Sequence, residues 1–263
     1  SISGKDKKYP KLVALPPLHP NCRHVLVPYV EIPEARKKGT PEQKELDRSR
    51  MPGVAVNTTR ATDQSLKFFY DATTLDALFY ADMKMRSKLA KVGVDAETFS
   101  YVKRCWNMAS NSAETIAFQW AAGEELGASF SPWQQKNKIE RFGIKRPKNI
   151  AEYRRMARVI YDETQKKLRD AGVTELVVFR GEKSATGDLA GRELTRVGNL
   201  LESWSLNPKS ASDTFGTGQG CFAMKVPAER VFSFRATGPG VSLEYEFLLL
   251  GGVEDNVSFV VTD

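Results

Sequence analysis

Two acidic residues separated by a single position are the first candidates for chemistry in this chain. Glu244 and Glu246 lie in an otherwise apolar stretch, residues 241–250, whose composition predicts a β-strand. Residues i and i+2 of a strand point to the same face, so the two carboxylates would be neighbours. Like charges so close together repel each other, and partial burial strengthens the repulsion. The pair therefore indicates either a functional site or an exposed edge strand protected against aggregation.

Polar side chains that could accompany these carboxylates occur earlier in the chain. Arg180 ends the apolar run 176–179, and its guanidinium offers a planar fork of donors suited to a diphosphate or a carboxylate. A salt bridge at the rim of a sheet would explain the arginine as well. Ser203 and Ser205 flank a tryptophan, and ordinary turn chemistry would explain both serines.

A glycine-rich loop follows the serines. Its glycines, Gly216, Gly218 and Gly220, are only weak evidence for phosphate binding. The loop lacks the lysine of a P-loop, and no helix is expected after it.

The order of these features resembles the Arg–Ser–Glu signature of mono-ADP-ribosyltransferases. The matching segments are Val-Val-Phe-Arg-Gly at 177–181, Glu-Ser-Trp-Ser-Leu-Asn-Pro at 202–208 and Leu-Glu-Tyr-Glu-Phe-Leu-Leu at 243–249. The resemblance covers about residues 150–263 and implies NAD as a substrate. Trp204 departs from the pattern, because the family usually has a small threonine there.

The resemblance assigns the central chemistry to three residues. Glu246 would stabilise the oxocarbenium-like centre that forms when the bond between nicotinamide and ribose breaks, and would bind the ribose 2′-hydroxyl. Glu244 would orient or deprotonate the acceptor. Ser203 would hydrogen-bond Glu246 and fix its rotamer.

Binding of NAD is implied for the residues around this centre. Arg180 would hold the diphosphate, and Ser205 would support the NAD pocket. Gly181 would let backbone groups approach the nicotinamide amide. Phe215 would stack on the nicotinamide ring or simply anchor its loop, and residues 235–243 would recognise the acceptor.

The acceptor is expected to be arginine. Relatives with Glu-x-Glu tend to modify arginine, whereas Gln-x-Glu relatives choose other acceptors. A carboxylate beside the acceptor can bind a guanidinium and accept its proton.

The elements that must position these residues follow from periodicity. Apolar spacing of three and four residues predicts helices over 63–85 and, as two pieces, over 97–126. A third helix is expected to begin at a capping box formed by Asn149 and Glu152 and to end before Gly172.

After this helix the pattern becomes that of strands. We expect strands at 176–179, 221–226, 230–235, 241–250 and 257–262, with a helix over about 189–202. The predicted class is α+β: a helical N-terminal region followed by a mixed or antiparallel β-sandwich core of the ADP-ribosyltransferase type. The expected divisions are a Pro-rich extended arm (1–62), a helical region (63–148) and a catalytic core (149–263).

Composition and charge exclude other classes. Of 263 residues, 41% are hydrophobic and 10% aromatic, which is enough to build a folded core. We expect no membrane span and no signal peptide, and three cysteines argue against a disulfide framework. Residues 1–150 carry a net charge of +9, which suits contact with DNA or an acidic partner, whereas residues 151–263 carry −2.

The N-terminal arm carries a second resemblance. His-Pro-Asn-Cys-Arg at 19–23 resembles an element of Mu-type phage minor head proteins. It implies a virion-associated enzyme, or one delivered into the target bacterial cytoplasm, that acts on a host acceptor protein, with phage capsid or DNA as possible partners of the basic half. His19, Cys22 and His24 could supply three zinc ligands, but no fourth is near, so no metal is expected.

Two other functions remain open on the sequence. One is a structural or DNA-contacting virion protein with a decayed transferase fold. The other is a toxin of the NAD glycohydrolase type that uses the same site.

Overall fold

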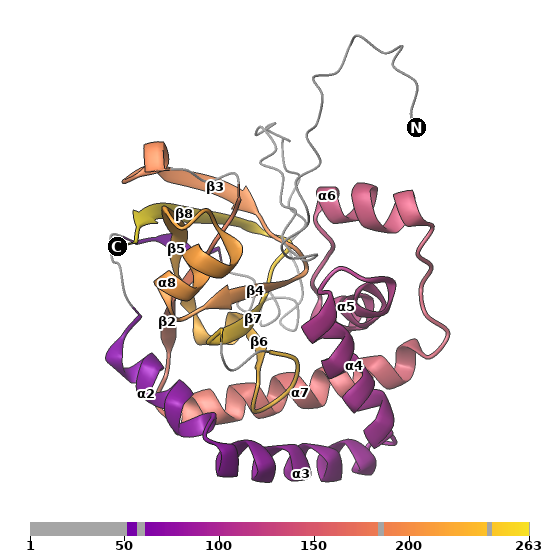
Figure 1. Ribbon diagram of the computed structural model, residues 1–263. Coiled ribbons are helices and arrows are strands. Elements are labelled where there is room, and N and C mark those ends of the chain that lie inside the picture. Colours follow the sequence, from indigo (N-terminus) through magenta and orange to yellow (C-terminus); the bar gives the residue numbers. More distant parts are fainter. Residues whose placement is uncertain (1–51, 57–60, 184–186, 241–243, 263) are drawn as a thin grey trace, which may run out of the picture.

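The structure is a computed structural model that describes residues 52–56, 61–183, 187–240 and 244–262 (Figure 1). Helices precede most of the strands in the chain, as expected for an α+β protein. The helical part comprises α2 (Asp63–Ala72), α3 (Leu75–Lys91), α4 (Ala96–Met108), α5 (Ala113–Leu126), α6 (Pro132–Gln134), the π-helical turn η1 (Gln135–Glu140) and α7 (Ile150–Asp170).

Side-chain caps fix where most of these helices begin. Thr62, Thr74, Asp95 and Ser112 each accept a hydrogen bond from a backbone N–H in the first turn of α2, α3, α4 and α5. The single helix expected over 63–85 is therefore two helices, because Thr74 starts a new one.

The predicted capping box of α7 is wrong. Asn149 makes no side-chain capping bond. Glu152 instead accepts a hydrogen bond from the backbone N–H of Asp95, 3.3 Å away, and so links the starts of α7 and α4.

The strands form one antiparallel sheet in the described part of the chain, in the order β3-β8-β5-β2-β4-β7-β6, with β1 added on β5. They are β1 (Val54–Ala55), β2 (Glu175–Arg180), β3 (Glu193–Val197), β4 (Leu201–Ser205), β5 (Gly220–Pro227), β6 (Val231–Phe234), β7 (Glu246–Leu250) and β8 (Glu254–Val261). Between them lie the 3₁₀ turns η2 (Gly187–Leu189) and η4 (Ala228–Arg230), the short helix α8 (Pro208–Ser210) and the π-helical turn η3 (Ala211–Phe215). β2 and β4 are joined by one residue pair, Phe179 with Ser205.

The helix expected over 189–202 is wrong. That segment holds β3 and the start of β4, which pair with β8 and β7 respectively. Strand pairing there buries Leu201 and brings Arg196 onto Glu202 in a buried ion pair. These long-range gains outweigh the local preference for helix.

The strand expected over 241–250 is shorter than predicted. β7 begins at Glu246, and Glu244 and Tyr245 form a turn before it; residues 241–243 lie outside the described part. Strand alternation therefore does not relate Glu244 to Glu246.

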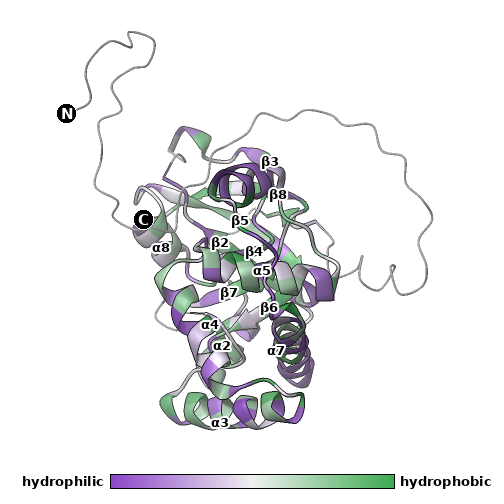
Figure 2. Cartoon of the chain, turned by 90° about the vertical axis from the view of Figure 1, so that its right-hand side faces the viewer, coloured by the Kyte–Doolittle hydropathy of each residue, from purple (hydrophilic) through white to green (hydrophobic). Residues whose placement is uncertain are grey.

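Two hydrophobic clusters hold the sheet and the helices together. Along β7, Leu248 and Leu250 face a cluster that includes Phe118 of α5 and Met156 of α7. Phe247 and Leu249 face the other cluster, which α2 enters through two phenylalanines. Figure 1 shows α7 running beneath the sheet, and Figure 2 shows hydrophobic and hydrophilic residues side by side along α3. The expected boundary at 148/149 therefore runs through a shared core.

The expected N-terminal arm lies mostly outside the described residues. Its described residues are 52–56 and 61–62, and Val54–Ala55 pair with β5. The candidate zinc ligands and the phage-like element at 19–24 lie outside the described residues, as do most of the first 60 positions. Within the described residues, no helix is both long and apolar enough to cross a membrane.

Candidate active site

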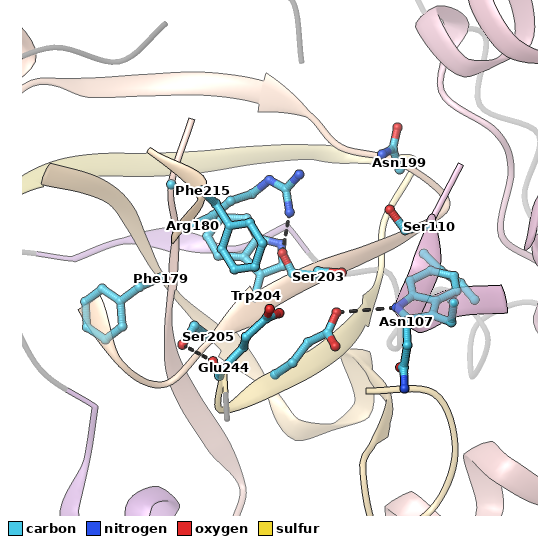
Figure 3. Close-up of a pocket in the computed structure, with 14 residues that line it drawn as sticks. Asn107, Ser110, Phe179, Arg180, Asn199, Ser203, Trp204, Ser205, Phe215 and Glu244 are labelled. Atoms are coloured by element: carbon cyan, nitrogen blue, oxygen red, sulfur yellow. Dashed lines mark hydrogen bonds between the residues drawn. The ribbon is translucent and has the colours of Figure 1, made fainter. Parts of the chain in front are cut away.

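A pocket lies at the junction of β2 and β4 and opens to solvent; together with the solvent-filled space at its mouth it measures about 680 Å³. The pocket is lined by every residue that the sequence singled out for catalysis or NAD binding: Arg180, Gly181, Ser203, Ser205, Phe215, Glu244 and Glu246. In Figure 3, Arg180 and Phe215 lie above Glu244, and Asn107 and Ser110 lie to the right of it.

Glu246 is the first residue of β7 and is 5% exposed. It lies on the same face of the strand as Leu248 and Leu250, which is the face covered by the helices. Its Oε1 accepts a hydrogen bond from the indole Nε1 of Trp106 at 3.4 Å. The carboxylate therefore points toward the end of α4.

Glu244 reaches the same pocket through a turn. Tyr245, between the two glutamates, has φ +53°, the only positive φ of a non-glycine residue in the described structure. Its ring packs on Phe69 and Tyr70 of α2. Ser205 donates from Oγ to the carbonyl oxygen of Glu244 at 2.6 Å. A strained backbone held by such contacts is characteristic of functional sites.

The surroundings of Glu244 disfavour its charged form. Burial, and then the negative charge of Glu246, raise the pKa of Glu244 to about 7. A carboxyl group with such a pKa can change protonation state near neutral pH, as a general base must.

Arg180 ends β2 and is 7% exposed. Its Nε lies 3.5 Å from Glu202 and 3.8 Å from Glu182, and its Nη1 donates to the carbonyl oxygen of Ser203. Arg196 joins this cluster with a two-pronged contact to Glu202 and a bond to Glu182 at 2.9 Å. The buried group thus holds two cations and two anions beside the pocket.

Ser203 and Ser205 lie at the end of β4, on the same face as Leu201. Ser205 pairs directly with Glu246, whereas Ser203 pairs with Leu248. The hydrogen bond from Ser203 to Glu246 that the resemblance implied stays a prediction. Of the two serines, Ser205 is the direct cross-strand neighbour.

Trp204, the departure from the family pattern, has a clear structural role. Its indole Nε1 donates to Glu202 at 3.1 Å, and the guanidinium of Arg196 lies over its ring at 5.4 Å. The side chain therefore packs on the buried charge cluster, on the strand face opposite the two serines.

Gly181 is required by the protein's own backbone. A Cβ atom there would lie 1.9 Å from the carbonyl oxygen of Ala211 and 2.8 Å from the carbonyl carbon of Phe215. The missing side chain thus lets η3, which carries Phe215, pack on the end of β2. Close approach of a nicotinamide to Gly181 stays a prediction.

Several pocket residues were not predicted from the sequence. They are Trp106, Asn107, Ser110, Phe179, Asn199, Leu201 and Trp204. The first three come from α4 and the turn after it, a stretch that periodicity identified only as helical. A tryptophan followed by asparagine and serine near a helix end was the available signal, but it is a weak one.

We found no match to this chain among protein-family models, curated proteins or solved structures.

Proposed function

We propose that the protein is an NAD-dependent mono-ADP-ribosyltransferase that modifies a protein side chain, with arginine as the acceptor. One observation carries the proposal: two carboxylates, two serines, an arginine, a glycine and a phenylalanine from four separate segments line a single pocket. These are the seven residues to which the resemblance assigns catalysis or NAD binding. The same proposal includes a β-sandwich core. Strands β3, β8, β5 and β2 would form one half and β4, β7 and β6 the other, and the two would meet at the single residue pair between β2 and β4.

The reaction breaks the bond between nicotinamide N1 and ribose C1′, and nicotinamide leaves with the bonding electrons. The Glu246 carboxylate stabilises the positive charge that develops on the ribose. A guanidinium nitrogen of the acceptor then bonds to C1′ and gives its proton to Glu244. The half-buried position of Glu244 suits this role, because its raised pKa makes it a better proton acceptor than an ordinary glutamate.

Arg180 fits this scheme with a double role. Its guanidinium belongs to the buried cluster with Glu182 and Glu202, and it also lines the pocket. A diphosphate would therefore meet an arginine already held in place. Such preorganisation lowers the entropic cost of binding.

The pocket also fits NAD glycohydrolysis, in which water replaces the acceptor. The observation that favours this second function is the partial exposure of Glu244, which would let the same carboxyl group accept a proton from water. Free ADP-ribose without labelled protein would identify it.

The setting that we propose follows from the resemblance alone. The acceptor would be a host protein, and the enzyme would travel in a virion or be delivered into the bacterial cytoplasm. The alternative of a decayed transferase that contacts DNA predicts salt-sensitive DNA binding without NAD turnover.

The decisive experiment incubates the purified chain with labelled NAD, bacterial lysate and, separately, agmatine as a small guanidinium acceptor. We expect labelled protein, labelled agmatine and released nicotinamide. Glu246→Gln should abolish all three, because the developing cation loses its counter-charge. The control is Glu254→Gln, an equivalent change at an exposed glutamate of β8. Unchanged transfer by Glu246→Gln would refute the mechanism.

A further inference from the structure

The end of α4 forms a wall of the pocket that the resemblance does not include. Trp106 is in the last turn of this helix and is 2% exposed. Asn107 follows it, and Ser110 lies in the turn before α5; all three line the pocket. Since α4 belongs to the helical region, that region contributes directly to the site.

Trp106 contacts a proposed catalytic group directly. Its indole Nε1–H can only donate, and it donates to Oε1 of Glu246 at 3.4 Å. The distance is at the long end for a hydrogen bond, and such contacts in substrate-free sites commonly tighten when substrate binds.

A buried amide network holds this wall in place against the sheet. Gln119 of α5 donates to the carbonyl oxygen of Ser110 at 2.7 Å, and Gln134 donates to Gln119 at 3.0 Å. Gln134 in turn accepts from the backbone N–H of Leu200, just before β4, at 2.7 Å. Both glutamines are fully buried. The end of α4 is therefore tied to the strand that carries the two serines.

The hydrogen bond from Trp106 to Glu246 suits the chemistry of the pocket. Glu246 is buried beside a second carboxyl group, so its charged form and its rotamer need support. A donor from a rigid helix supplies both without adding a competing charge.

On the basis of the proposed function, we infer that Trp106 is a positioning residue: its indole N–H holds the Glu246 carboxylate in the orientation that stabilises the developing ribose cation. The helical region is then an integral part of the active site. Trp106 acts through Glu246 and not on NAD itself, so its loss should lower kcat and leave KM for NAD nearly unchanged.

The test compares full-length variants in steady-state NAD hydrolysis and in NAD binding by calorimetry. Trp106→Phe keeps an aromatic ring but lacks the donor; we expect kcat to fall about 10- to 100-fold, with KM and Kd for NAD within about twofold of the wild type. The matched control is Trp120→Phe, at a half-buried tryptophan that packs on Phe130 away from the pocket, and it should keep the wild-type kcat.

A second variant separates the hydrogen bond from packing. 3-Benzothienylalanine at position 106 has the shape of tryptophan with sulfur in place of the N–H, so it should fold like the wild type and show the same loss of kcat as Trp106→Phe. A wild-type kcat in this variant, or a raised KM with normal kcat, would overturn the inference while Glu246→Gln still upheld the proposed function. Absence of NAD turnover by the wild-type chain would instead refute the proposed function itself.

Discussion

Ser205 of β4 lies directly opposite Glu246 of β7 in the antiparallel sheet. The same serine donates from Oγ to the carbonyl oxygen of Glu244 and accepts from the backbone N–H of Asn207 at 2.9 Å. One hydroxyl group thus ties the end of β4 to the turn that bears Glu244.

Ser205→Ala removes only one hydroxyl group, but it should disturb the pocket strongly. Both hydrogen bonds are lost in a buried place, so we expect the free energy of unfolding to fall by about 1–2 kcal/mol. Transfer of ADP-ribose to agmatine should fall more than NAD hydrolysis, because the turn that carries Glu244 loosens. Urea unfolding measures the loss of stability, and the transfer and hydrolysis assays measure the two activities. Wild-type stability together with wild-type rates would contradict the prediction.

Ser203→Ala is the informative companion variant. It keeps the backbone carbonyl that accepts from Arg180. A loss of activity without a loss of stability would therefore support the predicted bond between the Ser203 hydroxyl and Glu246.

The raised pKa of Glu244 predicts the pH dependence of transfer. The proton acceptor must be the carboxylate, which forms as the pH rises through about 7. Transfer to agmatine should thus increase between pH 6 and pH 8. Glu244→Gln should lose most transfer, retain more NAD hydrolysis, and show no rise near pH 7. Initial rates of transfer measured between pH 6 and pH 8 test this prediction. A wild-type rate that does not change over this range would exclude Glu244 as the base.

Gly181→Ala should displace the loop that carries Phe215. The added methyl group would overlap the carbonyl oxygen of Ala211, so we expect a loss of about 1–3 kcal/mol in unfolding free energy and a higher KM for NAD. Gly187→Ala is the control, because a Cβ there meets only the end of Gln219 at 3.7 Å. Equal stability of the two variants would show that the close approach is not essential.

Removing Arg196 should destabilise the fold strongly. Arg196→Met leaves the buried carboxylates of Glu182 and Glu202 with reduced compensation, for which we expect a loss of about 3–5 kcal/mol. Lys209→Met, in the exposed pair with Asp213, should cost less than about 1 kcal/mol. Denaturant unfolding of both variants tests the contrast, and a small loss for Arg196→Met would mean that the cluster contributes little.

Local patterns were enough to predict the helices and the strands whose signals are complete within a few residues. The period of α7 and the apolar run of β2 are examples, and both elements are present where expected. The resemblance carried by Arg180, the serines and the glutamates also singled out residues that line one pocket.

The segment 189–202 shows where such reasoning fails. Its leucines and charged residues suit a helix locally, but Arg196 and Glu202 form their buried ion pair across a strand connection. The partners of β3 and β4 lie about 40 to 65 residues away along the chain. No local pattern contains that information.

The amino-acid sequence by itself determined which side chains were available for chemistry and the order in which they occur. Only the tertiary structure decided that Tyr245 turns Glu244 into the pocket, that Arg180 joins a buried cluster, and that Trp106 contacts Glu246. The physical reason is that caps and periodicity act within one or two turns of chain, whereas strand register and helix packing are set by burial of distant groups against each other.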